Sequence, residues 1–151
     1  MQPRMKQPAT IVPGAMQAIK DLTTSVNSSS LPAATRHIVH LRVSQINGCS
    51  PCVVSGYTHA KKQGETDERL AAVAAWRDAP YFTDAERAAL ALAEAVTRLS
   101  DRADPVPDEI WDAAAEHHDE EQMAALILAI ALGNVYNRLN APTRQVAGAW
   151  G

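Results

Sequence analysis

The chain has 151 residues, a formal net charge of -3 at pH 7 and a pI near 5.9. This length allows one domain with a sizeable core, so we expect residues 1–151 to form a single domain. The acidic balance argues against nucleic-acid and anionic membrane partners, because both require a concentrated basic face. No run approaches the roughly 20 apolar residues that a membrane helix needs. We therefore expect a cytoplasmic protein with small-molecule or protein partners.

Apolar residues recur at helical spacing from the start of the chain onward. The residues before Pro8 are expected to form a loose terminus, and a first helix covers about residues 16–26. Ser30 is expected to cap a second helix that runs to about Ile46. A third helix follows from about residue 50 to 62, with Gly64 as its C-terminal stop.

Helices are also predicted in the second half of the chain, over about residues 66–78, 83–99, 107–117 and 119–133. Thr83 with Glu86, and Asp119 with Gln122, form capping boxes that begin two of them. Residues 123–133 are apolar on all sides and too short to cross a bilayer, so this helix is expected to be the central buried helix or part of a subunit interface. No segment alternates as a strand would. The predicted fold is all-α, with about six or seven helices.

Both cysteines of the chain, Cys49 and Cys52, lie where the third helix begins. Pro51 fits the first turn of a helix, and thiols placed there are favoured as thiolates by the helix dipole and the free N–H groups. Two cysteines are too few for a structural disulfide framework, so a redox-active pair is predicted, ahead of a metal site or an inert buried pair. One CxxC without a second pair at zinc-finger spacing is weak evidence for zinc, even with His59 downstream and His37 and His40 upstream.

A series of motifs resembles the alkylhydroperoxidase D (AhpD) family of the carboxymuconolactone decarboxylase superfamily, over about residues 30–140. The motifs are LRVSQINGC at 41–49 followed by Cys52, GETDERL at 64–70, Trp76-Arg77, FTDAERAAL at 82–90 and NRL at 137–139. The resemblance implies an AhpD-like helical bundle that assembles as dimers, trimers or hexamers. It also implies a dithiol pair that reduces small hydroperoxides at the mouth of a helical pocket, recharged by an external dithiol or an adaptor protein. No cofactor and no metal are expected.

The chain departs from the family motif at two positions. The family places a glutamate twelve residues before the first cysteine and a histidine four residues after the second, as a proton relay. His37 and Gly56 occupy these positions here. If the family packing holds, His37 could pass a proton to the thiols or hold a thiolate as imidazolium. The alternative is a partly buried histidine bonded to a carbonyl.

Two further side chains on the cysteine helix are weaker candidates. His59 lies about two turns beyond Cys52 and could complete an elongated pocket, or lie on the surface. Tyr57 could reach the site with its hydroxyl, or only pack. Which cysteine attacks is left open, although helix-start geometry usually leaves the first more exposed.

The predicted function is thiol-dependent reduction of small hydroperoxides, weak if the two altered relay positions matter. One alternative is a carboxymuconolactone decarboxylase-type enzyme acting on a small lactone or carboxylate, which needs no thiol pair. The other is a non-catalytic, redox-responsive helical oligomer.

Overall fold

The structure is a computed structural model that describes residues 2–149, apart from the side chain of Asp101. Within these residues it contains helices and no strand, as the sequence predicts. The α-helices are α1 (Pro8–Ile11), α2 (Ala15–Asn27), α3 (Ala33–Ile46), α4 (Ser50–Lys62), α5 (Asp67–Ala72), α6 (Asp84–Thr97), α7 (Asp108–His117) and α8 (Glu120–Asn140). Two short 3-10 helices, η1 (Val73–Ala75) and η2 (Leu99–Asp101), follow α5 and α6.

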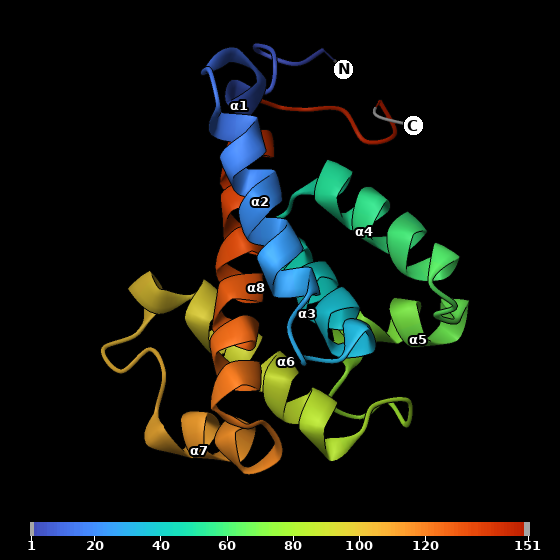
Figure 1. Ribbon diagram of the computed structural model, residues 1–151. Helices are drawn as coiled ribbons and strands as arrows, with labels where there is room; N and C mark the ends of the chain where they lie inside the picture. The colour runs from blue at the N-terminus through green and yellow to red at the C-terminus, as the bar shows by residue number, and fades with distance from the viewer. Residues whose placement is uncertain (1, 150–151) are drawn as a thin grey trace.

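Two helices share the centre of the bundle: α3, which contacts α4, α6 and α8, and α8, which contacts α2, α3, α4, α6 and α7. Figure 1 shows α2 and α8 side by side, with α4 and α5 on one side of them and α7 on the other. Residues on several faces of α3 are buried: Thr35, Ile38, Val39, Leu41, Val43 and Ser44. A single apolar stripe, which is what the spacing indicated, therefore understates how many neighbours surround this helix.

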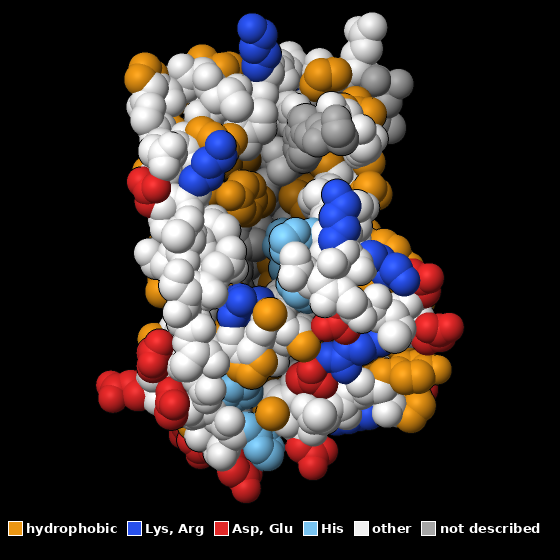
Figure 2. All heavy atoms as spheres, turned by 45° about the vertical axis from the view of Figure 1, so that its right-hand side comes forward, with side chains coloured by type: hydrophobic (Ala, Val, Ile, Leu, Met, Phe, Trp, Pro, Cys, Tyr) orange, Lys and Arg blue, Asp and Glu red, His pale blue; other side chains and the backbone are white. Residues whose placement is uncertain are grey.

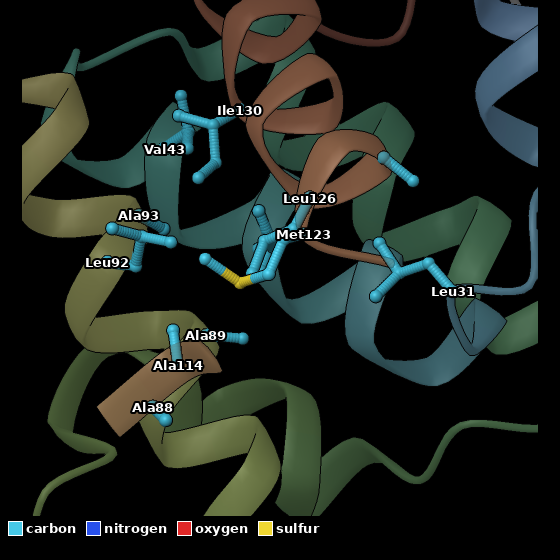
Figure 3. Packing of buried hydrophobic residues seen from close by; sticks show 12 residues of the cluster. Leu31, Val43, Ala88, Ala89, Leu92, Ala93, Ala114, Met123, Leu126 and Ile130 are labelled. Carbon is cyan, nitrogen blue, oxygen red and sulfur yellow. The ribbon is translucent and has the colours of Figure 1, made fainter. Parts of the chain in front are cut away.

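The main core cluster lies between α3, α6 and α8 and includes Ala114 of α7, which lies beside Ala88 and Ala89 of α6 (Figure 3). Val43 of α3 lies beside Ile130 of α8, and both are fully buried. A second cluster joins α3 to α4, α5 and α6, with Leu70 and Trp76 among its members. The two clusters fix α3 against α4 and α8, two of the helices that form the candidate site.

The last helix is both a core element and a surface element. It runs to Asn140, seven residues beyond the apolar segment, because its later turns bury asparagines. Gly133 lets it approach α3 closely, since a Cβ there would lie 3.1 Å from Cγ1 of Val43. Its other face is exposed and apolar, with Leu128 41% and Val135 39% exposed. Because α8 contacts α2, α3, α4, α6 and α7, the central position expected for this helix is confirmed, and its exposed apolar face leaves the interface alternative a prediction.

Most predicted helix ends are confirmed by local hydrogen bonds. Both capping boxes form, at Thr83 with Glu86 and at Asp119 with Gln122. The Ser30 cap is wrong, because α3 begins after Pro32 and no side chain caps it. The backbone N–H of Ser30 instead donates to Glu121 at the start of α8.

The expectation of a loose N-terminus is corrected. The N-terminal segment is tied to the C-terminal one, since the Arg4 N–H donates to the Thr143 carbonyl at 2.9 Å and Gln145 donates to the carbonyl of Met5. Trp111 of α7 is 44% exposed, because α7 packs only through residues such as the fully buried Ala114. Among the described residues, no helix has both the length and the apolar character that crossing a membrane requires.

Candidate active site around the cysteine pair

The cysteine loop turns sharply from α3 into α4. Gly48 has a φ of 62°, a left-handed conformation that glycine adopts without strain. Cys49 is the N-cap of α4, and its N–H donates to the carbonyl of Ser44 at 3.0 Å. Cys52 lies in the first helical turn, with Pro51 before it. The helix start predicted from Pro51 is thus confirmed, and it brings the two cysteine Cα atoms to 5.4 Å.

Cys49 and Cys52 are joined as a disulfide and are buried. Cys49 is 0% exposed and Cys52 is 3% exposed, so the first cysteine is not the more exposed one, contrary to expectation. The reason is that α8 packs across the loop. Asn140 of α8, itself buried, donates a hydrogen bond to Sγ of Cys52 at 3.4 Å.

A network of buried amides anchors the cysteine loop to α8. The side-chain amide of Asn47 donates to Asn134 at 3.0 Å and to Asn137 at 2.9 Å. Asn137 in turn donates to the hydroxyl of Ser44 at 3.1 Å. Because buried amides without partners are costly, this network fixes where the loop starts relative to α8.

Two cavities lie near α4, one at its start and one along its later turns. The smaller, about 260 Å³, is lined by Gly48, by Ser50 and Pro51 at the start of α4, and by the end of α8. The larger, about 340 Å³, lies between α2, α3, α4 and α8. Figure 2 shows histidine side chains beside a hollow in the middle of the face it presents. The residues lining the larger cavity include Val26, Arg36, His37, His40, Ser55, Gly56, His59, Leu132 and Tyr136.

His37 and His59 meet at the wall of the larger cavity. Their ring centroids are 5.4 Å apart and the rings are nearly perpendicular, at 82°. Nδ1 of His37 also lies 3.9 Å from Oε1 of Glu65, which is beyond hydrogen-bond distance. Burial is the main cause that lowers the pKa of His37, with His59 acting in the same direction and Glu65 against it. The structure therefore places both predicted histidines at one cavity, whose lining includes neither cysteine.

His40 is the residue of this site that the sequence motif did not single out. Its ring packs on Gly56 of α4, where an added Cβ would lie only 2.6 Å from Cδ2 of His40. The ring is also hydrogen-bonded to the backbone of Cys52. One signal was present in the sequence: His40 follows His37 by one helical turn, so both project from the same side of α3.

Tyr57 is not brought to the cysteine pair. Its hydroxyl donates to Oδ1 of Asp67 at 2.6 Å, and this hydrogen bond is the main cause that raises the pKa of Tyr57. Lys61 reaches the same carboxylate at 2.9 Å. Across residues 2–149, no three side chains of histidine, cysteine, aspartate or glutamate are arranged to hold a metal ion.

Comparison with known proteins agrees with this arrangement. The sequence profile described as "Carboxymuconolactone decarboxylase family" matches residues 13–95, more than half of the chain. The chain belongs to the carboxymuconolactone decarboxylase family. An uncharacterized relative, YdfG of Bacillus subtilis, is 36% identical over 130 residues, which cover 86% of this chain and 87% of YdfG.

Solved structures show that this family member has the AhpD-like fold. The crystal structure of ATU0492 from Agrobacterium tumefaciens superposes with a TM-score of 0.90 at 28% identity, covering 98% of this chain and 99% of that one. ATU0492 is described as a protein of unknown function and a candidate antioxidant defence protein AhpD. The debrominase Bmp8 superposes with a TM-score of 0.83 at 22% identity, covering 93% of this chain and 75% of its own. The Bmp8 likeness concerns the fold alone.

Proposed function

We propose that this protein is a thiol-dependent oxidoreductase that reduces small hydroperoxides through Cys49 and Cys52. The observation that carries the proposal is the cysteine pair itself, placed in the first turn of α4 and able to close as a disulfide. A thiolate in that turn is stabilised by the helix dipole and by the amide of Asn140. The likeness to ATU0492, with its description as a candidate antioxidant protein, supports the same chemistry.

The reaction balances with two thiols and one peroxide. One thiolate attacks the terminal oxygen of the hydroperoxide, the O–O bond breaks, and the products are a cysteine sulfenic acid and an alcohol. The second thiol then displaces hydroxide from the sulfenic acid, which leaves the disulfide and water. The peroxide is reduced by two electrons and the cysteine pair is oxidised. An external dithiol, small or carried by an adaptor protein, reduces the disulfide and completes the cycle.

The test is a thiol count on the purified protein. The reduced protein, freed of reductant, is mixed with one equivalent of tert-butyl hydroperoxide, and free thiols are counted with a chromogenic disulfide. We expect both thiols to be lost together and one peroxide to be consumed per chain. Cys49→Ser and Cys52→Ser should each abolish turnover with dithiothreitol. If excess peroxide leaves both thiols free, the proposal is wrong.

A second candidate function comes from the larger cavity and not from the thiols. Arg36 lines this cavity, burial lowers its pKa, and its guanidinium donates a hydrogen bond to the carbonyl of Leu31. A guanidinium beside apolar walls suits a small carboxylate or lactone, the substrate class of a decarboxylase-type enzyme. Such an enzyme should keep full activity in Cys49→Ser, whereas the thiol oxidoreductase should lose it.

We also propose that the chain forms a homo-oligomer through the exposed face of α8. Ala124, Leu128, Ala131 and Val135 lie on this face at helical spacing and are all exposed. Burying such a stripe against a second copy removes apolar surface from water. Light scattering of the purified protein should give a mass above one chain, and Leu128→Glu should lower it. The size of the assembly distinguishes a dimer from a trimer or hexamer.

A further inference from the structure

His40 is a titratable side chain enclosed between two helices at the cysteine site. Its ring lies over Gly56, 2.6 Å (Cδ2) and 3.1 Å (Nε2) from where a Cβ at position 56 would be. Real Cβ atoms do not approach ring atoms that closely, so a side chain on residue 56 and the present position of His40 exclude each other. The glycine makes room on α4 for an imidazole supplied by α3.

This placement sets the ring against the turn that carries the cysteines. His40 is hydrogen-bonded to the backbone of Cys52, and a neutral imidazole that donates one N–H keeps a lone pair on its other nitrogen. Burial is the main cause that lowers the pKa of His40, and this hydrogen bond acts against it. A neutral ring at pH 7 can accept a proton, which is what a general base requires.

The charged and titratable groups around His40 come from each helix that packs on it. Arg36 and His37 lie on its own helix, His59 lies on α4, and Tyr136 of α8 lines the same cavity. His37 and His59 both lower the pKa of His40. Glu65 lies beside His37, so its charge affects the pKa of His37 more than the pKa of His40.

We propose that His40 is the base of this site, which takes the proton of the attacking thiol in the Cys49–Cys52 pair. The proposal rests on the function proposed above. The imidazole accepts the thiol proton as the thiolate forms. When the O–O bond breaks, the imidazolium returns that proton to the departing alkoxide, so the alcohol leaves neutral and the ring is neutral again. His37 and His59 are positioning residues that keep the His40 ring in its neutral form.

The first experiment measures the thiols directly and needs no peroxide. The rate at which iodoacetamide alkylates the reduced protein is followed from pH 5 to pH 10 in the wild type, His40→Gln and His37→Gln. Alkylation follows the thiolate fraction. His40→Gln should raise the midpoint by about one pH unit and slow alkylation at pH 7 about tenfold. His117→Gln, at an exposed position on α7, is the matched control and should leave the profile unchanged.

The outcomes separate the two proposals. A His40→Gln profile that coincides with that of the wild type overturns the assignment of His40, even if peroxide still oxidises the thiols. If the profile of His40→Gln is shifted but peroxide does not oxidise the thiols of the wild type, the role of His40 as the base is upheld and the hydroperoxide function is refuted. A merely structural role would lower the melting temperature without moving the alkylation midpoint.

A relocation experiment keeps the test decisive if His40→Gln folds poorly. Gly56→His alone should lower the melting temperature, because its Cβ meets the His40 ring. The double variant His40→Ala/Gly56→His puts an imidazole back between the same helices. The alkylation midpoint of this double variant should lie between that of His40→Ala and that of the wild type. If the double variant is folded and its midpoint equals that of His40→Ala, an imidazole at this place does not activate the thiols and the proposal fails.

Discussion

The side-chain amide of Asn140 donates a hydrogen bond to Sγ of Cys52 at 3.4 Å, and so joins the end of α8 to the first turn of α4. In the reduced protein this donor would stabilise negative charge on the sulfur of Cys52, were that thiol ionised. A hydrogen bond to the charged form of a group favours that form. The last turn of α8 is therefore part of the thiol environment.

Changing Asn140 to aspartate should weaken the thiolate. A carboxylate beside the sulfur replaces a donor with a like charge, which raises the thiol pKa. We expect the alkylation midpoint of Asn140→Asp to rise by about one pH unit or more. Gln63→Glu adds the same charge at the exposed C-terminal end of α4 and should leave the midpoint in place. Equal midpoints in the two variants would contradict this role for Asn140.

Glu94 should be a major stabilising carboxylate. It accepts hydrogen bonds from Arg42 at 2.7 Å, Trp76 at 2.9 Å and Arg77 at 2.8 Å. Although burial opposes ionisation, these donors hold the pKa of Glu94 down at about 2. Its contribution to the free energy of unfolding is therefore complete above pH 4.5 and is lost as the pH falls toward 2.

Glu94→Gln should cost roughly 2–3 kcal/mol at pH 7, because it leaves the partly buried guanidinium of Arg42 without its carboxylate. Urea unfolding measures this loss of stability. The difference in the free energy of unfolding between the variant and the wild type should narrow at pH 3, where Glu94 contributes less to the stability of the wild type. Glu116→Gln, on the exposed face of α7, serves as the control and should change little at either pH. A pH-independent gap would show that packing, and not charge, accounts for the loss.

Stability should also fall on mild acidification, because His37 and His40 have lowered pKa values in the folded state. The unfolded chain takes up protons at these residues near pH 6.5, whereas the folded chain takes them up only at lower pH. The free energy of unfolding should thus decrease as the pH falls below about 6.5. In His37→Gln/His40→Gln this slope between pH 7 and pH 5 should flatten, as measured by urea unfolding. An unchanged slope would assign the effect to other groups.

Gly133→Ala should destabilise the protein, although replacing a glycine in a helix interior with alanine normally raises the free energy of unfolding by about 1 kcal/mol. The new Cβ lies 3.1 Å from Cγ1 of Val43, and Val43 is fully buried and has little room to move. We expect a lower melting temperature in the wild-type background and a higher one in Val43→Ala, where the obstructing methyl groups are gone. A stabilising effect in both backgrounds would mean that α3 and α8 can separate slightly at no cost.

Local signals were sufficient to predict several of the helix starts and stops around the site, but not the start of α3 or the end of α8. The Thr83–Glu86 and Asp119–Gln122 capping boxes and the Pro51 helix start each depend on residues within a few positions of one another. The same holds for the reversal at Gly64, which has a φ of 96°. The Ser30 cap failed because three consecutive serines and a following proline allowed more than one starting point for α3.

Relations between helices were harder to predict. The contact of His40 with Gly56 joins α3 to α4, and the spacing of apolar residues within either helix does not predict this contact. The motif directed attention to His37, whose recorded neighbours are Glu65 and His59. The burial of both cysteines likewise depends on Asn140, 88 positions after Cys52 in the chain. Each of these features needs the packing of the whole bundle.

The asparagine network that ties the cysteine loop to α8 has a consequence for the fate of the protein under heavy peroxide exposure. Because Asn47 and Asn137 fix the loop, and both cysteines lie in one helical turn, the partner thiol stays close to any sulfenic acid that forms. Formation of the disulfide should then be faster than a second attack of peroxide on the sulfenic acid, which would produce the irreversible sulfinic acid. Asn47→Ala should loosen the loop and make the protein prone to inactivating overoxidation, visible as added oxygen in its intact mass.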